Sequence, residues 1–164
     1  MIEKEREGNP LERALPYILP NEYDVLITDI NDNDLESVGR ELNVARLSSA
    51  EGEGSFPVRG IMYGGNVRMF VPLVVKKRGV KVNAIFLIDS GSPNTYLRQD
   101  TLASLGFIES MPFDTSAHIH GYQMTVYRSR GHFENVDLLG QDFMRFARVQ
   151  AHYNYKDLEI SLNI

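Results

Sequence analysis

Asp89, Ser90 and Gly91 follow an apolar run at residues 84–88, so that a carboxylate and a hydroxyl stand where buried side chains end. A carboxylate held at a fixed point can take a proton from water and make that water a nucleophile. An Asp at a strand end also commonly caps a turn through its own backbone. The triplet alone leaves both interpretations open, because three such common residue types meet by chance in on the order of one chain in ten.

Other residue types that carry chemistry are sparse. His118 and His120 would share one face of a strand, where a metal could bind them. The chain has no Cys and no obvious third ligand, so we expect no metal and no cofactor, and we interpret both histidines as exposed. The lack of Cys also excludes disulfides and thiol nucleophiles. No Gly-x-Ser-x-Gly sequence places a serine nucleophile at a strand-to-helix turn.

The strand that leads to Asp89 is expected over residues 80–89. One face is apolar throughout, from Val80 to Ile88. The other face begins with Lys81 and Asn83 and becomes apolar at residues 85 and 87. This pattern predicts a strand that enters half-buried and ends buried on both faces, with Asp89 at its inner end.

The rest of the chain after Pro57 reads mainly as short strands. Pro72 interrupts a β-rich run, residues 67–75, and predicts an edge strand or a bulge there. A helix-like segment at 141–148 follows an apolar strand. The other expected elements are a turn at 76–79, a helical turn at 97–106 closed by Gly106, a hairpin at 117–128 around Gly121, and closing strands at 149–155 and 158–164.

Residues 1–57 differ in pattern and are assigned to an N-terminal α/β extension. A strand is expected at residues 23–30, and a helix after a capping box formed by Asn33 and Glu36. Residues 48–55, rich in Gly, Ser and Glu, read as a linker. The extension is interpreted as a packing segment or part of a precursor, and could also hold the following domain inactive until a cut near Ser55.

Residues from about 67 to the C-terminus resemble the retroviral-type aspartic proteases. The resemblance rests on VPLVVKKRGVKVNAIFLIDSGSPNTYL, the following LASLGF, the LLGQDFM stretch and the closing hairpin. It implies a mainly all-β, retropepsin-like barrel over residues 58–164, with one short helix in its C-terminal half. It also implies a homodimeric aspartic endopeptidase, because the chain has one Asp-Ser-Gly and the family's active site needs two.

The resemblance assigns roles to individual residues. Asp89 would be the catalytic carboxylate, Ser90 a hydroxyl that hydrogen-bonds across the dimer, and Gly91 the residue that lets the backbone turn tightly. The hydrophobic-hydrophobic-Gly element that packs beneath this loop would be Leu138, Leu139 and Gly140. The flap over a peptide substrate would be residues 119–126, with Ile119, His120, Gly121 and Tyr122 at its tip.

Two departures keep a second interpretation open. Only 31 residues, 107–137, separate the helical turn from Leu138, fewer than the family uses for a flap and return strands. Pro93 and Gln141 occupy positions where retroviral enzymes tend to place an ion pair. The alternative is a catalytically silent module that keeps the fold and binds peptides or dimerises.

Composition restricts the partners and the compartment. The formal net charge of -5 at pH 7 gives no basis for binding nucleic acid or anionic lipid. The N-terminus is charged, and no apolar run approaches the length of a membrane span. We expect a peptide or protein substrate, a second copy of the chain as partner, and a cytoplasmic or virus- or transposon-associated protein that is not secreted.

Overall fold

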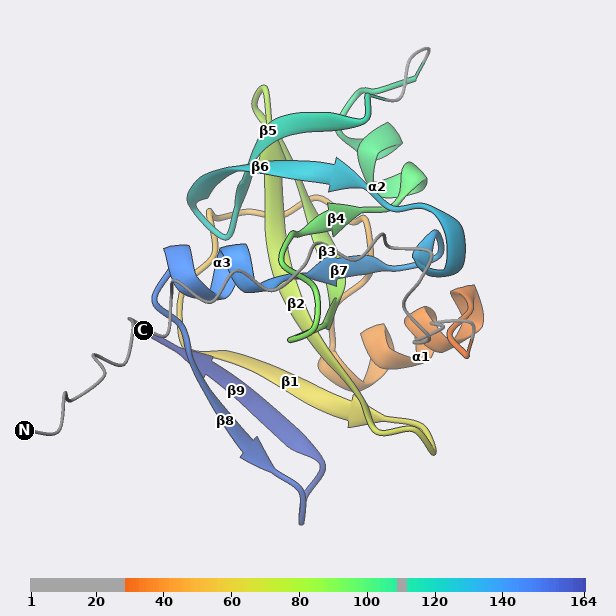
Figure 1. Ribbon diagram of the computed structural model, residues 1–164, viewed down its shortest axis with the longest axis vertical. Helices are drawn as coiled ribbons and strands as arrows, with labels where there is room; N and C mark the ends of the chain where they lie inside the picture. The colour runs from red at the N-terminus through yellow and green to blue at the C-terminus, as the bar shows by residue number, and fades with distance from the viewer. Residues whose placement is uncertain (1–28, 109–111) are drawn as a thin grey trace, which may run out of the picture.

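The protein was analysed as a computed structural model that describes residues 29–108 and 112–164 (Figure 1). Strands dominate, and the helices are short. The elements are α1 (Asp32–Leu42), β1 (Val58–Tyr63), β2 (Arg68–Lys77), β3 (Val80–Ile88), β4 (Tyr96–Leu97), α2 (Gln99–Ser104), β5 (Asp114–Ile119), β6 (Tyr122–Arg128), a 3-10 turn at Gly131–Phe133, β7 (Asp137–Leu139), α3 (Gln141–Phe146), β8 (Gln150–Asn154) and β9 (Glu159–Asn163).

Six strands close into a barrel in the order β3-β7-β4-β6-β5-β2, because β2 pairs again with β3. β7 lies between β3 and β4, parallel to the first and antiparallel to the second. β1, β9 and β8 continue the sheet from β2 and extend away from the barrel (Figure 1). The predicted mainly β barrel with a short helix in the C-terminal half is confirmed.

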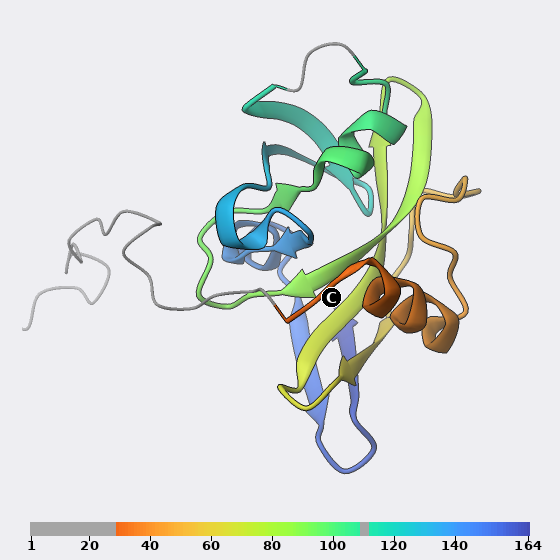
Figure 2. The ribbon, with the colours of Figure 1, turned by 90° about the vertical axis from the view of Figure 1, so that its right-hand side faces the viewer.

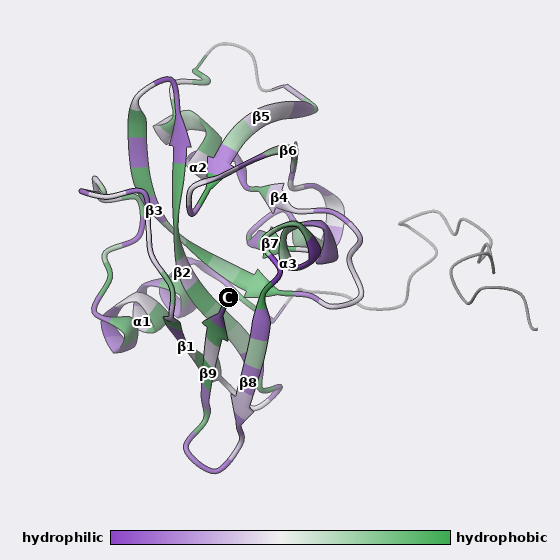
Figure 3. Cartoon of the chain, turned by 90° about the vertical axis from the view of Figure 1, so that its left-hand side faces the viewer, coloured by the Kyte–Doolittle hydropathy of each residue, from purple (hydrophilic) through white to green (hydrophobic). Residues whose placement is uncertain are grey.

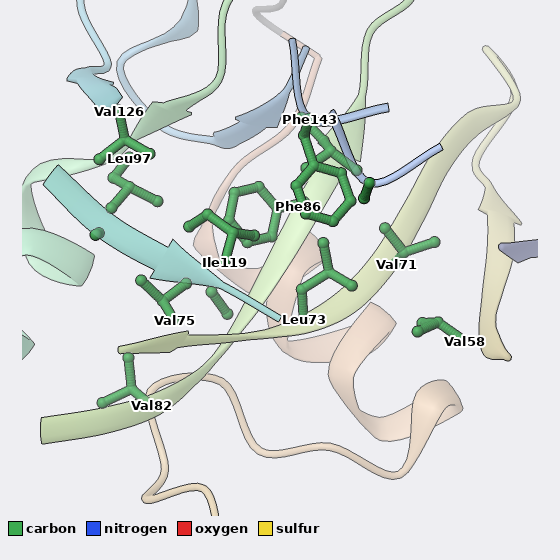
Figure 4. Close-up of a cluster of buried hydrophobic side chains, with 14 of the residues drawn as sticks. Val58, Val71, Leu73, Val75, Val82, Phe86, Leu97, Ile119, Val126 and Phe143 are labelled. Carbon is green, nitrogen blue, oxygen red and sulfur yellow. The ribbon is translucent and has the colours of Figure 1, made fainter. Parts of the chain in front are cut away.

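The barrel core is a cluster of buried apolar side chains from all six barrel strands and from β1, β9, α2, α3 and the turns after both helices (Figure 4). Burying such a cluster is the main source of stability for a domain of this size. Its buried members are Val58, Val71, Leu73, Val75, Val82, Ala84, Phe86, Leu97, Leu102, Leu105, Ala117, Ile119, Val126, Leu139, Phe143, Ala147, Ile160 and Leu162.

β3 is buried on both faces, as predicted. Ala84 and Phe86 point into the barrel core, whereas Ile85 and Leu87 belong to a second cluster on the opposite side, the outer cluster. Figure 3 shows apolar residues continuing along β2 and β3. The outer cluster contains Ile30, Leu35, Val38, Ile61, Phe70, Ile85, Leu87, Phe133, Val136 and Leu138.

α1 covers the outer cluster and lies beside the barrel strands (Figure 2). Its capping box is formed by Asn31 and Asp34, so the predicted pair of Asn33 and Glu36 is wrong by two residues. The reason is that Asn31 adopts the extended backbone of a cap, and its side chain accepts from the Asp34 N–H. The strand predicted at residues 23–30 lies outside the described residues except for its last two positions.

Residues 47–50, which overlap the start of the segment predicted as a linker at 48–55, hydrogen-bond to β3. The Leu47 N–H donates to the Asn83 carbonyl, and the Asn83 N–H donates to the Ser48 carbonyl. These residues can pair with β3 because its edge is open before residue 86, since β7 pairs with β3 only at residues 86–88. This segment therefore fills the edge of β3 that precedes its pairing with β7.

Two further expectations concern β2 and β9. Pro72 does not lie on an edge strand, because β2 pairs with β3 along its length and with β1 and β5 on its other side. It is accommodated where that second side has no paired residues, between Phe70 and Val75. β9 alternates as predicted, and its buried residues Ile160 and Leu162 pack in the barrel core of the same chain.

Candidate active site

Asp89 lies directly beyond the last residue pair of two parallel strands. Ile88 of β3 pairs with Leu139 of β7, and the Asp89 N–H then donates to the Leu139 carbonyl at 3.0 Å. Asp89 is half-buried at this point. Two rows of core side chains therefore fix the position of its backbone, one on each face of β3.

The Asp89 side chain caps its own turn with one oxygen. The Gly91 N–H donates to Oδ1 at 2.9 Å, and the Ser92 N–H donates to the Asp89 carbonyl at 3.2 Å. Within the described residues, Oδ2 makes no hydrogen bond, and the exposed Ser90 hydroxyl makes none either. The turn-cap interpretation thus accounts for half of the carboxylate and leaves the other oxygen open to a second group.

Gly91 differs from its expected role. Its φ is not in the left-handed region that would demand glycine, so the tightness of the turn does not explain the residue. A Cβ at this position would lie 3.2 Å from Asp89 Oδ1. The glycine therefore leaves space beside the carboxylate rather than permitting an unusual backbone conformation.

Gly140 is required by a close crossing of two segments. A Cβ there would lie 2.1 Å from the Asn94 carbonyl oxygen, and no side chain can be accommodated at that distance. The Gly140 N–H donates to Thr95 Oγ1 at 3.1 Å, and the Gln141 N–H donates to the Ser92 carbonyl at 2.9 Å. The predicted Leu138, Leu139 and Gly140 element is thus brought against the loop that carries Asp89.

Thr95 and Asp142 form a second link across this crossing, which the sequence analysis missed. Asp142 accepts from the Thr95 N–H at 3.0 Å and from its hydroxyl at 2.7 Å. The Asp142 N–H donates to the Pro93 carbonyl at 3.2 Å. A carboxylate in the first turn of the helix-like segment after Gly140 was the available signal. Pro93 and Gln141 carry no ionisable side chain, so no ion pair can form between them. The hydrogen bonds between Thr95 and Asp142 join the two segments instead.

Asp137 is a second carboxylate close to the site and is fully buried. It begins β7 and accepts from the Arg98 N–H and the Thr101 hydroxyl, each at 2.8 Å. Burial raises the pKa of Asp137 to about 7, although these two hydrogen bonds oppose the rise. Both oxygens are engaged with the start of α2, so Asp137 anchors that helix beneath the site.

The residues predicted to form the flap tip lie elsewhere. Ile119 pairs with Val75, which in turn pairs with Val82. Val82 precedes Asp89 by seven residues, about 20 Å along a strand. The tip is a two-residue turn, His120 and Gly121, with φ of 49° and 89°. The structure therefore places Ile119 far from Asp89, whereas Tyr122 packs against α3, which follows Gly140.

The hairpin tip is also fixed in place. The His120 N–H donates to the Val74 carbonyl at 2.7 Å, and His120 Nε2 lies 2.9 Å from the Ser55 carbonyl. The Phe56 ring packs edge-on against His120, and the Tyr122 side chain packs against Phe143 of α3. Only 8% of His120 is exposed, and burial lowers the pKa of its imidazole. The expectation that His120 is exposed is therefore wrong, because residues 55 and 56 cover it.

Neither a metal site nor a membrane span emerges from the described part of the chain. Across residues 29–108 and 112–164, no group of three or more His, Cys, Asp or Glu side chains is arranged to hold a metal ion. Among the helices of those residues, none has the length and apolar character that crossing a membrane requires.

Comparisons with known proteins find distant similarity to solved structures. No protein-family model matches the sequence, and no curated protein matches it. A solved structure, described as a retropepsin-like aspartic protease from Rickettsia conorii, shares 16% sequence identity with a TM-score of 0.43. The match covers 73% of this chain and 96% of that chain. At this level of similarity, the function must be argued from the chain's own residues.

Proposed function

We propose that this protein is an aspartic endopeptidase that works as a homodimer, with one Asp89 from each copy. The observation that carries the proposal is the placement of Asp89. It ends a strand that is buried on both faces, its backbone is held by Leu139, and one carboxylate oxygen has no partner within the described residues. A carboxylate whose backbone is fixed and whose second oxygen has no hydrogen-bond partner is suited to proton transfer.

The second carboxylate has to come from another chain. Asp137 and Asp142, the other carboxylates that support this site, each accept hydrogen bonds with both oxygens. A two-fold axis beside the loop would bring the Asp89 residues of two copies together. The exposed Ser90 hydroxyl is next in the chain and is available for contacts across that axis.

Two carboxylates about 3 Å apart cannot both ionise and so share one proton. The ionised member removes a proton from water while the protonated member donates to the carbonyl oxygen of the peptide bond. Attack of the water on that carbonyl and collapse with a protonated amine leaving group complete hydrolysis. The pair titrates as a unit, so activity is expected to peak at acidic pH.

One observation favours the alternative of a catalytically silent binding module. The hairpin that would have formed the flap is fixed to β2 and to residues 55 and 56. Enzymes that cleave peptides usually close an element over the substrate to exclude water. A module that binds a peptide without turnover has no such requirement.

The test is peptidase activity on an unstructured protein substrate between pH 4 and 7. Asp89→Asn should lower the rate by about 10²-fold or more, because it removes the shared proton chemistry. Asp114→Asn makes the same change at an exposed position of β5 and should leave the rate unchanged. Cleavage that survives Asp89→Asn would reject the mechanism, and a wild type that dimerises without cleaving would establish the silent module.

Mixing experiments test the shared site directly. An excess of Asp89→Asn chains should suppress wild-type activity, since mixed dimers hold only one Asp89. Activity per chain should also fall on dilution below the dimer dissociation constant. Activity that is linear in protein concentration and indifferent to added variant would exclude the two-chain site.

A further inference from the structure

The chain between α1 and β1 passes the tip of the β5–β6 hairpin before it enters β1 (Figure 1). Residues 47–50 of this connection pair with β3. The part that follows, residues 51–57, is here called the strap. It is attached to the hairpin tip through His120, and its one ion-pairing side chain contacts Lys76 and Lys81.

Both nitrogens of the His120 imidazole make hydrogen bonds. Nε2 lies 2.9 Å from the Ser55 carbonyl oxygen. Because a carbonyl oxygen can only accept, Nε2 carries the hydrogen and donates it. Nδ1 accepts from the Val74 N–H at 3.4 Å. A neutral imidazole has one donor and one acceptor nitrogen, so the docked strap fits the neutral form of His120.

A charged imidazole does not fit the same contacts. Protonation places a hydrogen on Nδ1, where it would face the hydrogen of the Val74 N–H. The ring is also buried, and burial lowers the pKa of the His120 imidazole, although the contact with the Ser55 carbonyl opposes this change. Protonation of His120 therefore requires its ring to leave this position.

The strap is packed so closely on this ring that it cannot stay in place when the ring moves. Gly54 lies directly against the imidazole, since a Cβ at this position would be 2.1 Å from Nδ1 and 2.3 Å from Cε1 of His120. The Phe56 ring packs edge-on against the same imidazole, with ring centroids 4.9 Å apart. Movement of the imidazole away from Val74 would displace both residues. The hairpin itself would remain, because six residue pairs join β5 to β6 without using the imidazole.

No neighbouring charge accounts for this behaviour of His120. The titratable and charged side chains on the elements around the tip are His118 of β5, Tyr122 of β6, Lys76 and Lys77 of β2, Lys81 of β3 and Glu53 of the strap. Burial and the Ser55 contact are the causes of the lowered pKa of His120. Glu53 accepts from Lys76 at 2.6 Å, which lowers the pKa of the Glu53 carboxyl below 4.5. This exposed ion pair therefore persists as pH falls from 6.5 to 4.5.

We propose that acid releases the strap: protonation of His120 detaches residues 54–56 from the hairpin tip, while residues 47–50 stay paired with β3. Release exposes Phe56 and makes the junction between the N-terminal extension and the barrel accessible at acidic pH only. The proposal does not depend on the proposed function, because neither Asp89 nor a second copy of the chain takes part in it.

The direction and size of the pH effect follow from the two states of the imidazole. With the strap released, the pKa of His120 returns to its ordinary value of 6.5, whereas in the docked state it is lower. The docked state therefore binds the proton less tightly. The contribution of His120 to docking is complete above pH 6.5 and is lost as pH falls toward the docked value. The ratio of released to docked chains should rise by up to about tenfold for each pH unit in that window.

The test follows position 56 of the full chain by fluorine NMR. 4-Fluorophenylalanine replaces Phe56 alone, in the Asp89→Asn chain so that no peptidase activity alters the sample. Between pH 7.5 and 4.5 the fluorine resonance should move from a docked to a released position, with a midpoint below pH 6.5. Gly54→Ala, which leaves no room beside the ring, should give the released resonance already at pH 7.5. A wild-type resonance that stays at one position over this range would overturn the proposal.

Three glutamine variants identify the group that responds. His120→Gln keeps a donor for the Ser55 carbonyl but cannot be protonated, so its resonance should stay at the docked position throughout. His118→Gln and Glu53→Gln remove neighbouring titratable groups and should leave the midpoint unchanged. The same transition in His120→Gln, or its loss in either of the other two variants, would assign the response to another group and overturn the proposal.

Two further measurements keep the result independent of folding defects. Circular dichroism should stay constant over the pH range, and a fluorine transition that coincides with loss of the folded signal would be global unfolding and would overturn the proposal. If His120→Gln does not fold, the ring-proton resonances of His120 are followed in the labelled chain. They should titrate with the same midpoint as the fluorine resonance, and a different midpoint would overturn the proposal.

Discussion

Asp89 and Asp137 lie on neighbouring parallel strands but have opposite environments. Asp137 pairs with Phe86, and Asp89 follows the end of the same strand. Asp137 is fully buried, and both of its oxygens accept hydrogen bonds from the start of α2. Asp89 is half-buried and uses one oxygen to cap its own turn. Over three residues along β3, the neighbouring carboxylate thus changes from one with both oxygens hydrogen-bonded to one with a single oxygen hydrogen-bonded.

The comparison teaches that a perturbed pKa and a reactive position are different properties. The carboxyl whose pKa rises to about 7 is Asp137, since burial disfavours its charge. Side chains with shifted pKa values often lie at functional sites, but buried side chains with a structural role have shifted pKa values for the same physical reason. Here the availability of an oxygen, not the size of the pKa change, distinguishes the group proposed for chemistry.

The largest expected effect is on stability. Asp137→Ala should lower the free energy of unfolding by about 4 kcal/mol, because the Arg98 N–H and the Thr101 hydroxyl lose their acceptor in the core. Asp89→Ala should cost less than about 1 kcal/mol, since only the Gly91 N–H loses a partner at a half-exposed turn. Urea unfolding at pH 5 measures both. Comparable losses in the two variants would mean that Asp89 and Asp137 contribute equally to stability.

The next effect is a pH dependence that belongs to Asp137. Its folded pKa of about 7 lies above the value of 3.8 expected in the unfolded chain, so the folded protein holds the proton more tightly. This contribution is complete below pH 4 and is lost as pH rises through 7. It amounts to about 3 kcal/mol between pH 4 and pH 7.

The measurement is the urea midpoint across that range in wild type, Asp137→Asn and Asp89→Asn. The slope should flatten in Asp137→Asn and persist in Asp89→Asn. An unchanged slope in Asp137→Asn would show that Asp137 is ionised in the folded protein throughout.

A third prediction concerns the crossing that positions Asp89. Gly140→Ala places a methyl group 2.1 Å from the Asn94 carbonyl oxygen. The resulting displacement should cost about 2 kcal/mol in stability and move the Asp89 loop. Gly65→Ala, at a glycine whose Cβ would meet no atom within 4 Å and whose φ is not in the left-handed region, controls for the loss of glycine. Wild-type stability in Gly140→Ala would mean that the crossing is looser than described.

The smallest effect tests the tip of the hairpin formed by β5 and β6. Phe56→Leu keeps an apolar side chain but removes the ring contacts with His120 and Tyr122. It should lower the free energy of unfolding by about 1 kcal/mol and leave the KM for a peptide unchanged. A raised KM would mean that this hairpin acts on substrate after all.

Local patterns in the sequence predicted the elements that local physics controls. The apolar residues of β3 predicted its burial on both faces. The turn predicted at 76–79 is observed as the two residues Arg78 and Gly79, whose φ values are both positive. Contacts between distant residues were not predictable. His120 reads as an exposed tip because the residues that cover it, Ser55 and Phe56, lie about sixty-five residues earlier in the chain.

The support of the site was predicted only in part. Leu138, Leu139 and Gly140 were found because they form a recognisable apolar-apolar-glycine element. Asp137 was missed because a carboxylate beside an apolar run usually marks the solvent side of a strand. Its burial depends on Arg98 and Thr101, which no periodicity links to β7. Asp142 was missed for the same reason, since its partner is Thr95.

The cover that α1 gives to the outer cluster has a practical consequence for anyone shortening this chain. A fragment beginning at residue 57 would contain the whole barrel and Asp89 but would lack α1. It would expose Phe70 of β2, and Ile85 and Leu87 of the strand that leads to Asp89, to water. Such a fragment would be expected to precipitate, and its silence in an assay would say nothing about catalysis.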